Sequence, residues 1–435
     1  MMWRRRRLLQ GLAGALALPV SAWGAAAPRQ LNILTSYPDE VMARFEAAFE
    51  QRYPQYRIRY LWRMPHDALP YLENQSGADT VDVFWAASPR TFARLKSEHL
   101  LRKLELDRSG LPSAISKTVI SDPDGYYLAT EVAGYVVAYN TASLAKLGVS
   151  PPRDWPELAN PSLAGNIALP VPSEVGFAPV MYDIVLQAFG WERGWALWSE
   201  IAALSVLVHR GATFISEDVG SGKIAVGLSI DFFVKAAISN GAPLRQSYPQ
   251  HNGMNPGHVA LPVAGTNSAG AQAFAEFVLS PQGQALLLHP EIRKLPVRPA
   301  TYAAAGAGEF NPFAAAEQGS MDYDGALSRE RLNVISAVFD AMLAQPHEEL
   351  RVLWHRVHAA EARGMDMAPV RAVLSAPPLS ESEARADAVK RPLQATLEGA
   401  KASGNAEADA LKSAWAERCT ARRATARGML EQMKA

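Results

Sequence analysis

Residues 207–238 read LVHRGATFISEDVGSGKIAVGLSIDFFVKAAI, and this stretch decides the fold class. One apolar run ends at Gly211, a short helical turn and a glycine-containing loop follow, and a second apolar run ends at Asp231. Buried strands that end in polar loops are typical of an open α/β sheet, which binds small ligands at the carboxyl ends of its strands. The stretch therefore predicts two neighbouring loops that face a ligand.

The alternation of strands and helices extends through most of the chain. Strand patterns cover residues 30–36, 56–62, 81–85, 131–139, 166–169 and 259–262, and helical patterns separate them. This alternation predicts βαβ units and a largely parallel sheet. From about residue 320 the strand patterns disappear, and apolar spacing predicts helices that pack on another part of the protein. Residues 380–435 are more polar, which fits either a helical pair or a partly mobile terminus.

Composition limits the class of protein. The chain has 435 residues, of which 49% are hydrophobic, enough for two or three domains with real cores. Its single cysteine, Cys419, excludes an internal disulfide and a cysteine-based zinc site. We expect neither a metal nor a cofactor, so stability must come from the packed cores.

The N-terminus has the order of a secretory signal peptide over residues 1–27. The basic stretch Arg4–Arg7 precedes an apolar run, Leu8–Val20, that is too short for a permanent membrane span, and Ala22–Ala27 supplies small residues for cleavage. The arginine run is compatible with the twin-arginine export route, but it also fits general secretion, which we favour. Removing four arginines from a chain of formal net charge zero leaves −4, which argues against nucleic-acid binding. We expect a periplasmic monomer that does not span the membrane.

Six segments together resemble the periplasmic solute-binding proteins of ABC importers, in the group that includes ferric-iron, thiamine and aminoethylphosphonate binders. They are LNILTSY at 31–37, VDVFW at 81–85, GYVVAYNT at 134–141, PSEVG at 172–176, the stretch 217–233, and FVLSPQGQ at 277–284. The resemblance implies a type II fold, in which two α/β lobes close over a ligand about a hinge of two crossing strands. The crossings are expected near 128–136 and 256–262.

The resemblance also sets the expected domains. They are a signal peptide at 1–27, lobe 1 at 28–130 and 259–300, lobe 2 at 131–258, and a C-terminal helical extension at 301–435. The tail, which includes LWHR at 353–356 and EAR at 361–363, is similar to that of the regulatory proteins of phosphoglycerate transport. Those proteins resemble solute-binding proteins with a helical extension, and they act with a partner to induce phosphoglycerate uptake.

Four strand-end loops supply most of the candidate ligand-binding residues. The candidates are Thr35, Ser36, Tyr37, Ser88, Ser173, Gly176, Thr213 and Ser216, and the second apolar run adds Asp231 and Phe232. Hydroxyls and the free amides of a first helical turn bind anions. The same residues also serve as ordinary helix caps, so no single loop decides the matter.

The sequence Asp231-Phe232-Phe233 separates two classes of ligand. In the ferric-iron binders that the chain resembles, the matching segment supplies adjacent tyrosines whose phenolates bind the metal. Phe232 and Phe233 have no ligand oxygen, so iron binding through this motif is not expected, and ordinary core packing is the alternative for both rings. An acidic Asp231 beside aromatic rings suits an ammonium group. With the hydroxyl-rich loops, this favours a phosphorylated or phosphonate solute, including a zwitterionic one.

Other motifs carry no chemistry. The segment 220–223, GSGK, resembles a phosphate loop, but Glu217 and Ile224 break its pattern. His355, His358 and Glu361 have metal-like spacing on a helix without the HExxH order, so a solvated helical face is expected. No nucleophile or carboxylate pair stands out, and an enzyme is not expected. The predicted partners are a small-molecule solute and an ABC permease, and the alternative is a regulatory role with a membrane-bound sensor protein.

Overall fold

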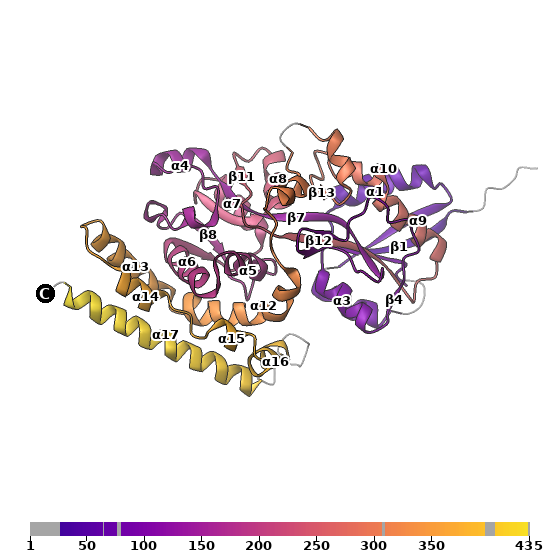
Figure 1. Ribbon diagram of the computed structural model, residues 1–435. Coiled ribbons are helices and arrows are strands. Elements are labelled where there is room, and N and C mark those ends of the chain that lie inside the picture. The colour runs from indigo at the N-terminus through magenta and orange to yellow at the C-terminus, as the bar shows by residue number, and fades with distance from the viewer. Residues whose placement is uncertain (1–26, 64, 76–79, 307–308, 396–404, 434–435) are drawn as a thin grey trace, which may run out of the picture.

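The computed structural model describes residues 27–63, 65–75, 80–306, 309–395 and 405–433 (Figure 1). The predicted signal peptide lies outside these residues except for its last position. Figure 1 shows two α/β lobes side by side, joined by the long strands β7 and β12, with the C-terminal helices layered on one lobe. The predicted α/β class and the helical extension are confirmed.

Lobe 1 is built on three parallel strands, β1 (Arg29–Thr35), β2 (Tyr56–Trp62) and β3 (Val83–Ala86), in the order β2-β1-β3. Successive strand residues point to opposite faces, so Leu31 and Ile33 pack under one helical layer while Leu34 packs under the other. The first layer contains α1 (Asp39–Arg52), α9 (Ser268–Leu279) and α10 (Pro281–Leu286), and the second contains α2 (Pro65–Glu73) and α3 (Pro89–Ser97).

Lobe 2 repeats this arrangement with β8 (Ile167–Pro170), β9 (Ser205–Val208) and β10 (Val226–Ile230), which run parallel in the order β10-β8-β9. One face of its sheet packs against α5 (Ala178–Phe189) and α6 (Trp191–Leu204). The opposite face packs against α7 (Ala212–Gly220) and α8 (Asp231–Ser239). Helix α4 (Thr141–Leu147) follows directly after β7.

Two long antiparallel strands, β7 (Tyr127–Tyr139) and β12 (Met254–Pro262), connect the lobes. Ala86 at the end of β3 pairs with His258, which pairs with Ala129, whereas Ile230 at the end of β10 pairs with Tyr135. The two sets of parallel strands therefore end facing each other across a few residues of β7. This register brings the strand-end loops of both lobes to one interlobe region.

Short elements complete the lobes. They are β4 (Leu101–Arg102), β5 (Ala114–Ile115), β6 (Thr118–Val119), β11 (Arg245–Ser247), β13 (Leu295–Pro296), α11 (Pro312–Glu317) and 3-10 turns at Trp155–Leu158, Pro161–Leu163 and Pro299–Ala304. Strand β13 pairs with β7 and places Pro296 opposite Glu131. This pairing holds the segment after α10 beside the hinge.

The C-terminal extension packs on lobe 2 and shares its core. It consists of α12 (Gly325–Phe339), a π-helical turn (Asp340–Ala344), α13 (His347–Glu361), α14 (Ala368–Ser375), α15 (Glu381–Ala384), α16 (Asp387–Ala395) and α17 (Ala406–Gln432). In Figure 1 these helices lie along the face of lobe 2 that α5 and α6 form. Trp354 and Trp415 belong to the same buried cluster as Trp198 of α6, so the extension is part of the folded lobe.

Candidate ligand-binding site

The end of β1 directs a tyrosine into the interlobe region. Thr35, which is buried at the last position of β1, accepts a hydrogen bond from the Tyr37 backbone N–H at 3.1 Å through its hydroxyl. This local turn leaves Tyr37 only 3% exposed. Its ring lies edge-on to Trp85 at the end of β3, with 4.8 Å between the ring centres. Ser36, which lies between Thr35 and Tyr37 in the sequence, is half-buried.

A buried carboxylate on the hinge strand accepts a hydrogen bond from the Tyr37 hydroxyl. Glu131 of β7 is 1% exposed and also accepts a hydrogen bond from the Thr130 hydroxyl. The indole N–H of Trp85 donates to the Thr130 oxygen at 3.0 Å, which extends the network into the core of lobe 1. Burial, and next the negative charge of Glu131, raise the pKa of Tyr37 well above its ordinary value. Tyr37 is therefore a protonated donor at neutral pH.

Lys294 supplies the cation of this cluster. It lies just before β13 and donates from Nζ to Glu131 Oε1 at 3.1 Å, with both side chains almost fully buried. Its ammonium lies 4.2 Å from the centre of the Tyr37 ring and 4.6 Å from the centre of the Phe232 ring. The structure thus brings together two predicted residues, Tyr37 of lobe 1 and Phe232 of lobe 2, around a lysine that the sequence pattern did not indicate.

Asp231 lies beside this cluster, at the first position of α8. Its carboxylate accepts hydrogen bonds from the Gly134 N–H at 3.1 Å and from the Tyr248 hydroxyl at 2.8 Å. Burial raises the pKa of Asp231 above its ordinary value, while Lys235 and these donors act in the opposite direction. Asp231 therefore fixes the start of α8 against the hinge strand, a structural use that the sequence left open.

Three further candidates lie at or within helices, Ser88 at the start of α3 and both Thr213 and Ser216 in α7. Ser88 is half-buried at the N-cap of α3, where its hydroxyl bonds the Thr91 hydroxyl at 2.8 Å instead of a backbone amide. Thr213 is exposed in the first turn of α7. Ser216 is buried, and its hydroxyl donates to the Ala212 carbonyl at 3.3 Å within the same helix. Ser216 thus makes an ordinary intrahelical contact.

Ser173 faces the extension. It is exposed, and its hydroxyl donates to Asp340 Oδ1 at 2.9 Å, so a residue of the π-helical turn contacts the loop after β8. Burial raises the pKa of Asp340. Gly176 is exposed before α5, with no atom near the position of a Cβ. The loop after β8 therefore remains accessible between the lobe and the extension.

Three arginines lie shortly after the ends of parallel strands in the two lobes. Arg63 follows β2, Arg90 lies in the first turn of α3, and Arg210 follows β9. All three are exposed, and no carboxylate among the described residues forms an ion pair with them. Arg63 and Arg210 lie over the rings of Tyr71 and Phe214, at 4.9 and 4.3 Å from the ring centres.

Arg90 has a distinct environment. Although solvent reaches its side chain, the surrounding protein lowers its pKa by removing water from the charge, and Tyr323 acts in the opposite direction. Tyr323 precedes α12, and its carbonyl accepts the Thr118 hydroxyl of β6 at 2.7 Å. Arg90 is therefore an exposed cation at the start of α3, and Tyr323 is the residue whose charge acts on it.

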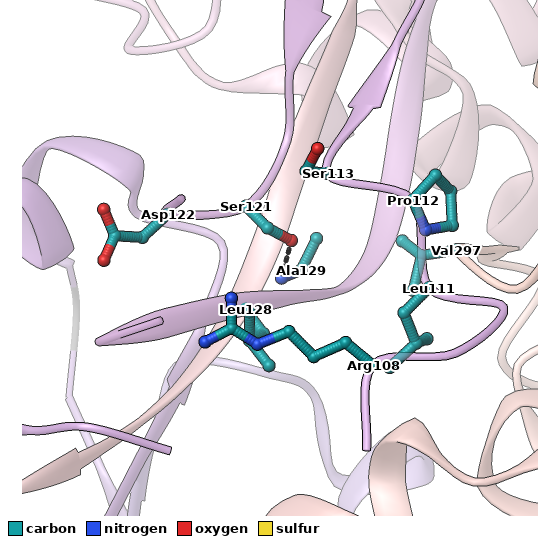
Figure 2. Close-up of a pocket in the computed structure, with 9 residues that line it drawn as sticks. All are labelled: Arg108, Leu111, Pro112, Ser113, Ser121, Asp122, Leu128, Ala129 and Val297. Atoms are coloured by element: carbon teal, nitrogen blue, oxygen red, sulfur yellow. Dashed lines mark hydrogen bonds between the residues drawn. The ribbon is translucent and has the colours of Figure 1, made fainter. Parts of the chain in front are cut away.

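Two small cavities lie elsewhere. The one in Figure 2 has a volume of about 30 Å³ and is lined by Arg108, Leu111, Pro112, Ser113, Ser121, Asp122, Leu128, Ala129 and Val297. It has room for about two water molecules. A second, of about 90 Å³, lies between α2 and α3 near Leu72 and Leu100. Neither cavity is lined by Tyr37, Phe232 or Lys294, so both are separate from the cluster around Lys294.

The sequence missed Glu131, Lys294 and Tyr248. Glu131 opens an apolar strand and Lys294 precedes Leu-Pro, so both patterns fit a solvated charge at the end of an element. The segment 289–296 has no periodicity that would place it beside the hinge. Only the pairing of β13 with β7 brings Lys294 to Glu131.

Several known proteins are similar to this chain in sequence or in fold. The sequence profile of the bacterial extracellular solute-binding proteins matches residues 78–313, more than half of the chain. The phosphoglycerate transport regulatory protein PgtC of Salmonella typhimurium is 26% identical over 357 residues, which cover 81% of this chain and 86% of PgtC. Among the described residues, no helix is both long and apolar enough to cross a membrane.

Solved structures show the same fold at low sequence identity. The periplasmic binding protein AfuA of Actinobacillus pleuropneumoniae, solved with fructose-6-phosphate bound, is 18% identical and has a TM-score of 0.55. It covers 72% of this chain and 98% of its own. Iron-bound HitA of Pseudomonas aeruginosa is 16% identical, has a TM-score of 0.56, and covers 71% of this chain and 99% of its own. These neighbours confirm the type II periplasmic-binding-protein fold, and the chain belongs to the bacterial extracellular solute-binding protein family.

Proposed function

We propose that this protein captures a small organic anion between its lobes in the periplasm and delivers it to an ABC permease. The observation that carries the proposal is a set of three exposed arginines, Arg63, Arg90 and Arg210. They follow parallel strands of both lobes and form no ion pair with a carboxylate among the described residues. A guanidinium binds phosphate and carboxylate groups through two parallel hydrogen bonds. Ser36, Ser88 and Thr213 add hydroxyl donors at the same strand ends.

A phosphorylated compound or a phosphonate is the favoured solute. PgtC is named for phosphoglycerate transport, and AfuA was solved with a sugar phosphate, so relatives of this chain are associated with phosphorylated solutes. In this proposal the lobes at 28–130 with 259–300 and at 131–258 close on the solute. Solute binding shifts the equilibrium from the open form to the closed form, and the permease recognises the closed form.

Ferric iron is not the proposed cargo. Phe232 and Phe233 stand at the start of α8 without oxygen ligands. Among the described residues, no group of three His, Cys, Asp or Glu side chains is placed to hold a metal ion. The phenol of Tyr37 is held protonated by its bond to Glu131 and by burial, which opposes metal binding by a phenolate.

A thermal-shift panel on the mature chain tests the proposal. The panel contains 3-phosphoglycerate, 2-aminoethylphosphonate and thiamine monophosphate, with glycerol as the uncharged control. Ligand at 100 to 1,000 times its dissociation constant stabilises a protein by about 2–4 kcal/mol. At least one phosphorus-containing compound should raise the midpoint by several degrees while glycerol has no effect. Equal responses to all compounds, or none, would refute the proposal.

A second candidate is a regulatory component that reports the solute to a membrane-bound sensor protein and so induces phosphoglycerate-type uptake. The extension and the match to PgtC over most of the chain favour it. A photo-crosslinking amino acid on the extension, at exposed positions 352 or 421, tests this role, with position 51 on lobe 1 as the control. A sensing role predicts crosslinks to a membrane protein from the extension, whereas crosslinks from position 51 alone would support transport only.

A further inference from the structure

Helix α12 of the extension runs antiparallel to α5 and ends beside the loop after β8. At its start, the Asp324 backbone N–H donates to the side chain of Gln187, near the end of α5, at 2.8 Å. At its end, the Phe339 ring centre lies 4.7 Å from that of Tyr182, in the first half of α5, and both side chains are fully buried. The Tyr182 hydroxyl donates to the carbonyl of the last residue of β8 at 2.8 Å. Core packing therefore holds Asp340, which follows Phe339, near the carboxyl end of β8.

Asp340 is the first residue of the π-helical turn, and it contacts the loop directly. The Ser173 hydroxyl donates to Asp340 Oδ1 at 2.9 Å, and the Ser336 hydroxyl, about one turn earlier, lies 3.4 Å from the Pro172 carbonyl. Such π-helical turns are frequent at functional sites. The loop follows a parallel strand of lobe 2, and the proposed solute binds at the carboxyl ends of these strands. The extension therefore contributes a side chain to the border of the proposed site.

A role in stability does not account for Asp340. Among the described residues it forms no ion pair, and the Ser173 hydroxyl is the one side-chain donor that bonds it. Burial raises the pKa of Asp340, and the Ser173 hydrogen bond acts in the opposite direction. Glu174 adds to the rise in this pKa, whereas Lys412 and His209 oppose it. A half-buried carboxylate without a paired cation lowers the stability of the folded state.

The contact with Asp340 decides what Ser173 offers to a solute. A serine hydroxyl carries one proton and two acceptor lone pairs. Its proton is engaged by the carboxylate, so the exposed Ser173 oxygen has only a lone pair left for an incoming group. The neighbouring Glu174 is also exposed and pairs with His209 at 2.9 Å, which places a second carboxylate beside Ser173. A phosphate oxygen meets two carboxylates and no free Ser173 proton here, whereas a hydroxyl or ammonium group meets an acceptor.

We infer that Asp340 is a positioning residue that makes Ser173 a hydrogen-bond acceptor, and that the solute carries a hydroxyl or ammonium donor in addition to its anionic group. The inference rests on the proposed function and narrows its class of solute. The arginines bind the anionic group, and Ser173 accepts a hydrogen bond from the donor. Anions that lack such a donor bind through the arginines alone, and more weakly. The extension takes part in this way in the choice of solute.

Two pairs of compounds, each differing in one donor group, test the inference on the full mature chain. The pairs are 3-phosphoglycerate with 3-phosphonooxypropanoate, which lacks the hydroxyl, and 2-aminoethylphosphonate with ethylphosphonate, which lacks the amine. In calorimetric titrations the wild type should bind the donor-bearing member of at least one pair about tenfold more tightly, the effect of one hydrogen bond. Asp340→Ala frees the Ser173 proton, so it should weaken binding of the donor-bearing member and leave the other member bound equally or more tightly. Asp387→Asn, at an exposed carboxylate of α16, is the control and should bind as the wild type does.

A double-variant cycle separates positioning from a structural effect. Because Asp340 acts through Ser173, Ser173→Ala should lose the same preference, and the double variant should lose no more than either single variant. The urea midpoint of Asp340→Ala should equal or exceed that of the wild type, since the carboxylate has no paired cation. If Asp340→Ala fails to fold, Asp340→Asn keeps the shape without the charge, and it should lose the preference too. A lower midpoint with equal losses for both members of a pair would show a structural role and overturn the inference.

Failure of this inference and failure of the proposed function give different results. A wild type that binds these anions without favouring the donor-bearing member of either pair would overturn the inference and leave anion capture standing. A preference that survives Asp340→Ala would do the same. Binding of none of the four compounds would refute the proposed function, and the inference with it.

Discussion

The guanidinium of Arg331 in α12 lies 2.6 Å from the carboxylate of Asp183 in α5, and both side chains are buried. This ion pair joins the extension to the core of lobe 2. Burial raises the pKa of Asp183, and the Arg331 charge acts in the opposite direction. A second network also joins the extension to lobe 2. The Glu200 carboxylate of α6 accepts hydrogen bonds from Arg371 of α14 and His358 of α13.

Breaking the buried pair should destabilise the protein strongly. Arg331→Met leaves Asp183 buried without its cation, which costs about 3–5 kcal/mol of unfolding free energy. Arg391→Met, which breaks an exposed pair with Asp387, should cost less than about 1 kcal/mol. Urea denaturation measures both, and the double variant Arg331→Met with Asp183→Asn should recover part of the loss. Equal losses for Arg331→Met and Arg391→Met would contradict a buried pair.

The extension should be needed for lobe 2 to fold. Trp415 of α17 is 3% exposed in the shared core, so Trp415→Ala should cost about 3–5 kcal/mol, while Val352→Ala at an exposed position of α13 should change stability by about 0.5 kcal/mol or less. Deletion of 320–435 exposes the α5 and α6 face and should abolish cooperative unfolding in calorimetry. A deletion variant with a sharp, reversible transition would show that the extension is an independent unit.

His258 should make the protein less stable in acid. Burial lowers the pKa of His258 to about 4, and its Nε2 bonds the Ile120 carbonyl at 2.8 Å. Between pH 6.5 and about 4 the unfolded chain binds a proton that the folded chain does not, so stability falls as the pH falls. The loss at pH 5 relative to pH 7.5 is about 2 kcal/mol.

Urea titrations of wild type and His258→Gln at both pH values test this assignment. The amide of glutamine does not titrate, so the variant should lose about 2 kcal/mol less than the wild type between pH 7.5 and 5. Since other groups contribute equally to both proteins, only the difference is assigned to His258. The same loss in both would show that His258 does not carry the effect.

Ferric iron should not bind at the start of α8. Phe232 and Phe233 offer no phenolate, and Tyr37 keeps its proton in a hydrogen bond to Glu131. Adding ferric citrate should therefore produce no visible tyrosinate-to-iron absorption. Phe232→Tyr with Phe233→Tyr serves as the comparison, because it restores two phenols at that position. A stoichiometric visible band in the wild type would contradict the assignment of an organic solute.

The sequence predicts a helix or strand well where one face of that element is apolar. The strand predicted at 56–62 is confirmed at both ends, and the first strand, predicted at 30–36, is β1 at Arg29–Thr35. The strand predicted at 259–262 begins five residues earlier, at Met254. Asn255-Pro256-Gly257 contains a proline and a glycine, which oppose a strand by pattern, yet pairing with β7 keeps this segment extended.

The candidate site was predictable only in part. Tyr37 and Phe232 follow strands that the sequence marks clearly, so their placement between the lobes follows from the topology. Lys294 and Glu131 carry charges that sequence patterns assign to the surface. Their burial depends on mutual pairing and on the strand pairing of β13, which joins segments more than 160 residues apart. Local sequence contains no signal for such a pair.

Arg90 should contribute to anion binding. Loss of a charge-assisted hydrogen bond costs about 1.5–3 kcal/mol, so Arg90→Met should weaken binding of the best phosphorus-containing ligand about tenfold or more. Arg44→Met, on the outer face of α1 where Arg44 pairs with Glu291, is the matched control and should bind normally. Calorimetric titration at low and moderate salt gives both constants. Unchanged affinity in Arg90→Met would remove this residue from the site.

Hydrogen exchange with and without 3-phosphoglycerate, measured by mass spectrometry on the mature chain, tests most directly whether an anion binds between the lobes. The account predicts slower exchange in peptides from both lobes at once, over the loops at 35–38 and 87–91 and over 209–214. Glycerol at the same concentration should cause no change. Protection confined to one lobe or to the extension, or unchanged exchange in these loops under conditions where the compound binds, would contradict the account.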